Sequence, residues 1–292
     1  MNGFLNILKP PGMSSGAVVN VIKHLTGERT GHAGTLDPEA AGVLPVMIGR
    51  ATRLLDYFPD KSKSYAAEIA FTGATDTQDA QGVIIEPQIR MPERKEIEAA
   101  LSSFTGVIMQ RPPAYSALKR DGVPLYALAR KGEMVEAEKR ETEIRRLTLG
   151  EKTARDGYML YVDCGAGTYI RTLCHDLGRA LGAPAHMRFL LRTRAGAFPI
   201  ETAFTLEEIK AAQEQGGLEK YLLPMDYPLQ EMQTLSVPEN YWKLARNGGK
   251  LPASLLPTLQ ENERCRVYAD TLLGVAHRAG NVIRFDVGLT GG

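Results

Sequence analysis

The segment Gly31-His32-Ala33-Gly34-Thr35-Leu36-Asp37-Pro38 holds one carboxylate among residues that either restrict or free the backbone. Gly31 and Gly34 permit positive φ, and Pro38 disfavours the helical region for the residue before it. A carboxylate fixed in an extended loop, five residues after a histidine, suits a nucleophile or a general base. An isolated Asp-Pro pair is usually an ordinary turn. This loop is longer and more particular than a turn needs, so its meaning depends on the rest of the chain.

The composition is that of a globular protein with a substantial core. The chain has 292 residues, of which 43% are hydrophobic and 24% charged. No apolar run approaches the ~20 residues that span a bilayer, and the N-terminus lacks the pattern of a signal peptide. The three cysteines, Cys164, Cys174 and Cys265, do not have zinc-ligand spacing. We therefore expect a cytoplasmic protein with reduced thiols.

Charge is unevenly distributed although the formal net charge is only +1. Residues 171–194 contain five arginines against one acid, Asp176, whereas residues 201–219 carry five glutamates and one lysine. The arginine run fits either a solvated helix face or a strip that binds RNA phosphates, and charge alone does not separate the two.

Local patterns predict alternating helices and strands followed by a small β-rich module. A helix is expected from Ser14 or Ser15 to Gly27, strands at 64–72 and 158–164, and a helix starting at Pro92. A further helix ends near Gly182, and Thr205 with Glu208 forms a capping box for the next. Beyond Pro238 the chain shows a short helix around 242–246 and short strands, including 272–276 and 281–287. We place a domain boundary at about residue 230.

The turn Gly165-Ala166-Gly167 follows a predicted strand and precedes a predicted helix. Such a turn cradles phosphates in nucleotide-binding folds and is similar to the glycine-rich turn of S-adenosylmethionine-dependent methyltransferases. Tyr169 and Ile170 stand where a third glycine is wanted, and too little α/β chain follows to complete a doubly wound sheet. The turn is better interpreted as presenting Thr168, Tyr169 and Arg171 from the start of the helix.

Several further motifs are unremarkable singly but specific in combination. Taken in order with the Asp37 loop, they are K-P-x-G-x-S-S from Lys9, K-x-Y at 63–65, G-x-T-D-T-x-D from Gly73, P-P-x-Y-S-A-L-K from Pro112 and G-T-Y-I-R-T-L from Gly167. The ordered set closely resembles the TruB family of pseudouridine synthases, bacterial enzymes that act on uridine 55 of tRNA. The resemblance runs from Asn6 to about Pro199 and continues more loosely over the C-terminal module.

The resemblance implies an α+β fold: a mixed, mainly antiparallel sheet flanked by helices, with a small C-terminal PUA-like β-barrel. The catalytic domain would span residues 1–230, with an RNA-gripping insertion at about 110–150, and the PUA-like domain 231–292. The reaction would isomerise one uridine of the tRNA T-loop to pseudouridine without cofactor or metal. A monomer that binds the T-arm stem-loop is the simplest expectation.

The resemblance also assigns roles to residues. Asp37 would be the nucleophile, Tyr65 would stack on the target base and assist proton transfer, and Arg171 would pair with Asp37 and keep it ionised. The other substrate-binding positions implied are His32, which would keep the nucleotide extruded, Tyr169 and Leu190, which would line the pocket, and Lys9, which would support the site from behind. Weaker RNA contacts are implied for Asp79, Tyr115, Lys119, Arg188 and Arg192.

Two departures and two alternatives stand beside this interpretation. Ala33 occupies a position that is threonine in other members, and residues 252–265 match the C-terminal module poorly. The charged stretch 119–146 fits either a tRNA grip or a solvated loop. An S-adenosylmethionine-dependent RNA methyltransferase rests only on the 165–167 turn. A non-catalytic RNA-binding or RNA-folding protein rests on the arginine run and the β-rich end.

Overall fold

The chain separates into two compact units in a computed structural model that describes residues 1–116, 118–120, 122–125, 128 and 137–290. The first unit comprises Met1–Pro38, Val43–Asp60 and Gly196–Gly292, and the second comprises Glu39–Gly42 and Lys61–Ala195. Among the helices of the described ranges, none is long and apolar enough to cross a membrane.

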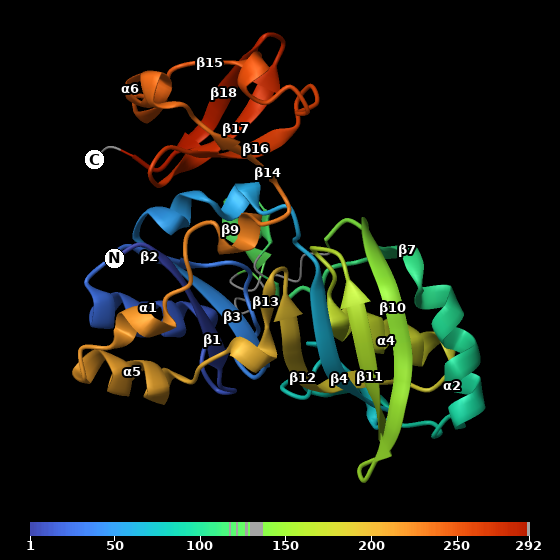
Figure 1. Ribbon diagram of the computed structural model, residues 1–292. Helices are drawn as coiled ribbons and strands as arrows, with labels where there is room; N and C mark the ends of the chain where they lie inside the picture. Colours follow the sequence, from blue (N-terminus) through green and yellow to red (C-terminus); the bar gives the residue numbers. More distant parts are fainter. Residues whose placement is uncertain (117, 121, 126–127, 129–136, 291–292) are drawn as a thin grey trace. The chain divides into compact units, whose positions relative to one another are not determined.

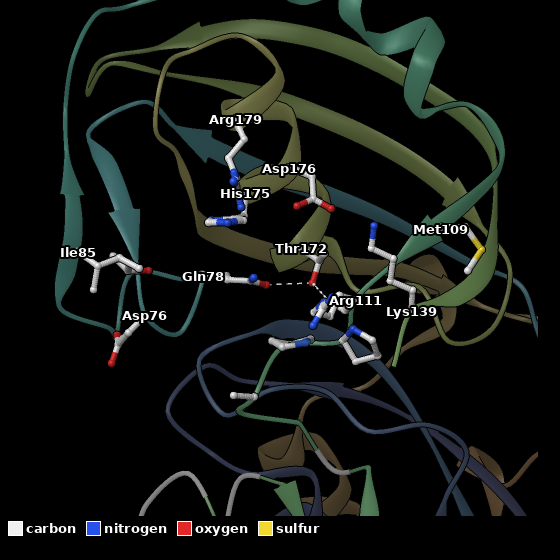
Figure 2. Close-up of a pocket in the computed structure, with 14 residues that line it drawn as sticks. Asp76, Gln78, Ile85, Met109, Arg111, Lys139, Thr172, His175, Asp176 and Arg179 are labelled. Carbon is white, nitrogen blue, oxygen red and sulfur yellow. Dashed lines mark hydrogen bonds between the residues drawn. The ribbon is translucent and has the colours of Figure 1, made fainter. Parts of the chain in front are cut away.

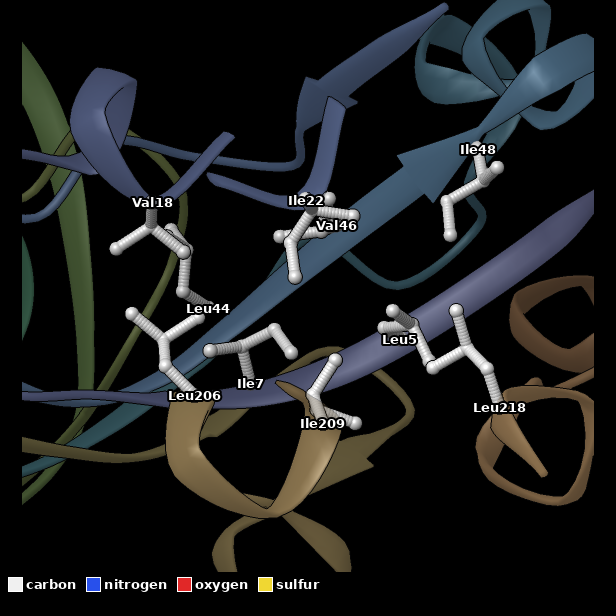
Figure 3. Close-up of a cluster of buried hydrophobic side chains, with 10 residues drawn as sticks. All are labelled: Leu5, Ile7, Val18, Ile22, Leu44, Val46, Ile48, Leu206, Ile209 and Leu218. Atoms are coloured by element: carbon white, nitrogen blue, oxygen red, sulfur yellow. The ribbon is translucent and has the colours of Figure 1, made fainter. Parts of the chain in front are cut away.

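Two helices and two neighbouring strands enclose the first core of unit one. β1 (Gly3–Lys9) lies beside β3 (Ala41–Ile48), and α1 (Ser15–Thr26) and α5 (Leu206–Glu214) supply apolar side chains to the same cluster. β2 (Thr30–His32) pairs antiparallel with β3 and leads into the Asp37 loop. Figure 3 shows the buried side chains of this cluster: Leu5, Ile7, Val18, Ile22, Leu44, Val46, Ile48, Leu206, Ile209 and Leu218.

The ends of both helices confirm the capping signals. The Ser14 hydroxyl accepts a hydrogen bond from the Ala17 amide at 3.1 Å, and Gly27 ends α1 at a φ of 69°. Thr205 and Glu208 form the predicted capping box of α5. Burial of Val18 and Ile22 on one face of α1 fixes the helix on the strands.

The C-terminal residues form a separate five-stranded sheet with its own apolar cluster (Figure 1), in keeping with the predicted PUA-like module. The strand order is β14, β16, β17, β18, β15, and only the β14–β16 pair is parallel among the pairs described. The elements are β14 (Gln233–Ser236), α6 (Trp242–Arg246), β15 (Leu251–Pro252), β16 (Arg264–Tyr268), β17 (Leu272–Ala279) and β18 (Val282–Gly288). The domain boundary at about residue 230 stays a prediction.

Unit two is built on a strongly antiparallel sheet in the order β12, β4, β11, β10, β7 (Figure 1). The first two residues of β3, Ala41 and Gly42, pair parallel with β12, which makes the sheet mixed as predicted. The helix α4 (Ile170–Ala180) packs against β12 and β4, and α2 (Arg94–Leu101) packs against β10. The strands are β4 (Lys63–Ala70), β7 (Gly106–Gln110), β10 (Arg140–Thr153), β11 (Gly157–Cys164) and β12 (His186–Ala195).

Unit two also contains two short antiparallel pairs, β5 (Gly73–Thr75) with β6 (Ile84–Pro87) and β8 (Lys119–Arg120) with β9 (Val123–Pro124). The predicted helix at Pro92 begins two residues later at Arg94, because Glu93 is the N-cap of a capping box with Glu96. Part of the stretch expected to grip RNA, residues 117, 121, 126–127 and 129–136, lies outside the described residues, and from Arg140 onward the stretch is the long strand β10.

Candidate functional site

The residue before Asp37 is held by a buried hydroxyl. Ser15, 2% exposed, accepts a hydrogen bond from the Leu36 amide at 2.9 Å and donates one to the Leu36 carbonyl at 3.0 Å. Both backbone groups of the residue before Asp37 are therefore satisfied by one side chain. The Asp37 side chain itself is half-buried, so its carboxylate stays within reach of a substrate.

A buried lysine fixes the residue after Asp37. Lys9 is fully buried, and its ammonium group donates to the carbonyls of Pro38 at 2.8 Å, Pro10 at 2.8 Å and Met13 at 2.5 Å. An ammonium has three donors, and here each meets a carbonyl oxygen. Lys9 therefore ties the N-terminal loop to the Asp37 loop. Its contact with substrate stays a prediction.

In unit two, Tyr65 stands near the start of β4 opposite Arg192 of β12, and the two residues are register partners. Tyr65 is 8% exposed, and Arg192 is the largest fully buried side chain described. Burial lowers the pKa of the Arg192 guanidinium, and its hydrogen bond to the Tyr65 side chain acts in the opposite direction. The structure thus gives Arg192 a partner inside the fold, whereas the sequence predicted a phosphate-facing side chain.

Gly42 allows this arrangement. Gly42 of β3 is the register partner of Arg192 where β3 pairs parallel with β12. Its φ is 112°, a conformation that favours glycine. A Cβ at this position would overlap the backbone of Arg192. Close approach of the two strands therefore requires glycine here.

Arg171, in the first turn of α4, joins two distant motifs. It is 5% exposed and donates to the carbonyls of Thr77 at 3.2 Å and Tyr115 at 3.0 Å. The Asp79 carboxylate lies 3.8 Å from the same guanidinium and accepts hydrogen bonds from Thr77 Oγ1 and the Gln81 amide. The structure therefore brings together Arg171, Asp79 and Tyr115, three predicted site residues from separate stretches of sequence.

Gln110 is a supporting residue that the sequence did not reveal. Its side chain is 3% exposed, and its amide accepts from the Tyr169 backbone N–H at 3.0 Å and donates to the Tyr169 carbonyl at 3.3 Å. Tyr169, the N-cap residue of α4, is thereby held on both sides of its backbone. Ser15 plays the same part for Leu36 and was also missed as a site residue. Ser15 ends the K-P-x-G-x-S-S motif, which was the available signal, whereas Gln110 lies in none of the quoted motifs and its role depends on contacts distant in sequence.

The remaining predicted residues lie in varied settings. Leu190 is 7% exposed on β12, and Arg188 pairs with Glu68 at 2.8 Å and donates to the Arg155 carbonyl. Lys119 lies in β8, and its side chain is outside the described part. His32 and Asp37 belong to unit one and Arg171 to unit two, so their meeting over one nucleotide stays a prediction.

The described residues were compared with the requirements of a metal site and of a disulfide. Within the described residues, no group of three or more His, Cys, Asp and Glu side chains is placed to hold a metal ion. Cys164, Cys174 and Cys265 are buried thiols, and burial raises the pKa of all three. They are therefore thiols rather than thiolates at neutral pH.

Comparison with known proteins gives a consistent family match. The family model "TruB family pseudouridylate synthase (N terminal domain)" matches residues 23–170, and "tRNA pseudouridylate synthase B C-terminal domain" matches residues 171–230. The tRNA pseudouridine synthase B of Alkaliphilus oremlandii (strain OhILAs) is 44% identical over 263 residues, covering 89% of this chain and 87% of the relative. That of Symbiobacterium thermophilum (strain DSM 24528 / JCM 14929 / IAM 14863 / T) is 46% identical over 241 residues, covering 81% and 79%. A chain of the crystal structure of a Cbf5-Nop10-Gar1 complex superposes with a TM-score of 0.75 at 26% identity, covering 99% of this chain and 85% of that one.

Proposed function

The chain belongs to the TruB family of pseudouridylate synthases, and on that premise we propose that it converts uridine 55 in the T-loop of tRNA to pseudouridine. The observation that carries the proposal is the match of family and relatives over most of the chain. The Asp37 loop supports it, because its backbone is held at Leu36 and Pro38 while the carboxylate remains half-buried.

The reaction is an isomerisation whose atoms balance within the substrate. The bond between the sugar C1′ and the base N1 breaks, the base turns, and a bond from C1′ to C5 forms. The hydrogen on C5 leaves to solvent as a proton, and N1 gains one. No net oxidation occurs, so the reaction needs no redox cofactor. We propose that the enzyme works without any cofactor or metal.

Asp37 is the proposed nucleophile, since a carboxylate can capture a sugar or base centre covalently or stabilise an oxocarbenium ion. A base in a folded loop must first be extruded, at a cost of about a few kcal/mol, and stacking on Tyr65 offsets part of that. We assign Arg171 to orienting Asp37, Tyr169 and Leu190 to lining the base pocket, and His32 to filling the space that the nucleotide leaves.

The substrate is handled by other parts of the chain as well. We propose that Asp79, Tyr115, Lys119 and Arg188 help to grip the T-arm, as RNA backbone contacts position the target without reading its sequence. We further propose a cytoplasmic monomer, which a single monomeric mass in size-exclusion chromatography with light scattering would support. A dimeric mass would contradict the monomer without bearing on the chemistry.

The methyltransferase alternative loses its basis. Its glycine-rich turn, Gly165–Gly167, lies inside the segment that matches the TruB family. The tight turn has a structural use: the Gly165 amide donates to the Glu143 carbonyl at 2.8 Å, and Gly167 adopts a φ of 83°.

Asp37→Asn tests the proposal. We expect the variant to bind a T-arm stem-loop with wild-type affinity but to release no tritium from RNA carrying 5-tritiated uridine. The control is Glu39→Gln, which removes a neighbouring exposed carboxylate and leaves tritium release unchanged. Full tritium release by Asp37→Asn contradicts the role of Asp37. A wild-type protein that binds the stem-loop without any release favours the non-catalytic RNA-binding alternative.

A further inference from the structure

A buried amide side chain joins the end of β7 to the start of α4 within unit two. On β7, Val107 and Met109 are exposed to solvent, whereas the last residue, Gln110, is 3% exposed and points into the protein. Burying an amide is costly unless its polar atoms are hydrogen-bonded. The partners of Gln110 therefore indicate what this residue does.

The Gln110 side chain bonds to both backbone groups of Tyr169. The Tyr169 N–H donates to Gln110 Oε1 at 3.0 Å, and Gln110 Nε2 donates to the Tyr169 carbonyl at 3.3 Å. The same carbonyl accepts from the Leu173 amide at 3.0 Å, which is the first hydrogen bond of α4. Gln110 therefore holds the peptide groups on both sides of the Tyr169 Cα atom.

Neighbouring residues of the same turn are also held from outside the helix. The hydroxyl of Thr142, on the strand β10 that pairs with β7, bonds to the Thr168 hydroxyl, which donates to the Gly165 carbonyl at 3.1 Å. After Tyr169, the Thr172 hydroxyl lies 3.3 Å from the Arg111 carbonyl, a contact that Figure 2 marks with a dashed line. The first turn of α4 is thus fastened to β7, to β10 and to the residue that follows β7.

Fixing both peptide groups of Tyr169 fixes the direction in which its side chain leaves the backbone. The ring then moves only by rotation about χ1 and χ2, each of which has few preferred values. Tyr169 is half-buried, so part of its side chain remains accessible, whereas Gln110 is too deeply buried to touch a substrate. Side chains of a functional site need to be held within about 0.5 Å of their productive geometry by such supporting residues.

We propose that Gln110 is a positioning residue for the base pocket and that it acts by fixing the backbone of Tyr169. This inference rests on the proposed function, which assigns Tyr169 to lining that pocket. Phosphate contacts dominate the affinity of proteins for nucleic acids. Gln110 therefore affects the rate of the reaction at saturation rather than the binding of the RNA.

Gln110→Met tests this role because it keeps the length of the side chain and removes both hydrogen bonds. In single-turnover tritium release with enzyme in excess, we expect the saturating rate constant to fall about tenfold. The enzyme concentration at half-maximal rate should stay within about twofold of the wild-type value. The matched control Gln88→Met, which changes an exposed glutamine of unit two, should alter neither quantity.

A purely structural role for Gln110 gives the opposite pattern. Partial unfolding lowers the concentration of active enzyme, so it raises the half-maximal concentration and leaves the saturating rate constant of the folded molecules unchanged. An unchanged saturating rate constant in Gln110→Met therefore overturns the proposal.

Fluorine NMR tests the position of the ring without any reference to activity. 3-Fluorotyrosine replaces Tyr169 and, in the control, Tyr158, a buried residue at the end of β11 away from α4. We expect Gln110→Met to shift or broaden the resonance from position 169 and to leave that from position 158 unchanged. An unchanged resonance at position 169 overturns the proposal.

A double substitution tests whether the effect passes through Tyr169. In a Tyr169→Ala background, Gln110→Met should change the saturating rate constant by less than about twofold, because the ring that it positions is absent. A further tenfold loss would overturn the proposal. An unchanged rate in Tyr169→Ala alone would overturn the role of Tyr169 and this proposal together, whereas a slow Tyr169→Ala beside a fast Gln110→Met overturns this proposal only. Tritium release by the wild type reports the proposed function separately, so the two failures are distinguishable.

Discussion

The Asp37 loop and the Tyr65 strand are held by opposite means. In the loop, buried side chains of Ser15 and Lys9 bind the backbone on either side of Asp37 and leave its carboxylate half-buried. On β4, the regular sheet already fixes the backbone, and the buried guanidinium of Arg192 binds the Tyr65 side chain itself. A carboxylate with the proposed role of nucleophile needs a rigid base and a reachable end, whereas a ring proposed to stack on the target base needs its own plane fixed.

This comparison predicts that substitutions in the two regions have different effects on stability and on rate. Loss of a backbone support in the loop should lower the stability of unit one together with activity. Loss of a partner of a functional side chain in unit two should lower the rate with less effect on the fold. Four substitutions test that division, from the largest expected effect to the smallest.

Arg171→Gln should have the largest effect. The shorter, neutral amide loses the hydrogen bonds to the Thr77 and Tyr115 carbonyls together with the positive charge beside Asp79. We expect the single-turnover rate to fall by about a hundredfold or more, as for other losses of electrostatic support in active sites. Arg94→Gln, which breaks an exposed ion pair with Glu98, is the control and should not change the rate. An unchanged rate in Arg171→Gln would remove this arginine from the mechanism.

Lys9→Met removes the ammonium group that holds the Asp37 loop to the N-terminal loop. The carbonyls of Pro10, Met13 and Pro38 lose a shared buried donor, so the free energy of unfolding in urea should fall by about 2–3 kcal/mol. Lys23→Met, an exposed lysine of α1, should change it by less than about 0.5 kcal/mol. Equal losses in the two variants would mean that the three hydrogen bonds do not support the loop.

Arg192→Met keeps the bulk of the side chain but removes its hydrogen bond to Tyr65. We expect the saturating rate to fall about tenfold because the ring loses an orienting partner, and Arg192→Lys should recover part of it. Arg194→Met on the same strand removes bonds to Ser62 and Ser64 instead, and should leave the rate within about twofold. If both methionine variants slow the reaction equally, the effect belongs to β12 rather than to Tyr65.

Ser15→Ala should have the smallest effect. The Leu36 amide and carbonyl lose their shared partner, and the free energy of unfolding should fall by about 1–2 kcal/mol. The exposed hydroxyl of Ser102, which bonds the Ala99 carbonyl, gives the comparison: Ser102→Ala should cost less than about 0.5 kcal/mol. A loss in Ser15→Ala no larger than that would show that the loop is held by Lys9 alone.

The sequence predicted the elements whose signals are local. Caps at Ser14 and Thr205 and alternation along β4 and β11 identified two helices and two strands correctly. β3 was not predicted, because Pro45 interrupts a run that is otherwise continuously apolar and therefore lacks alternation. The arginines of β12 suggested a surface strip, but burial of Arg192 and the ion pair of Arg188 with Glu68 place them within a sheet.

Ordered motifs identified the family correctly and implied roles for Asp37, Tyr65 and Arg171 that stay predictions. They could not show that Lys9 bonds three carbonyls, that Ser15 and Gln110 clamp the residues beside Asp37 and α4, or that Gly42 admits the backbone of Arg192. Those roles join residues many positions apart and exist only once the chain is folded. The sequence thus determined the family and the local elements, and the tertiary structure decided what holds each proposed reacting group in place, because hydrogen bonding and burial depend on distance in space.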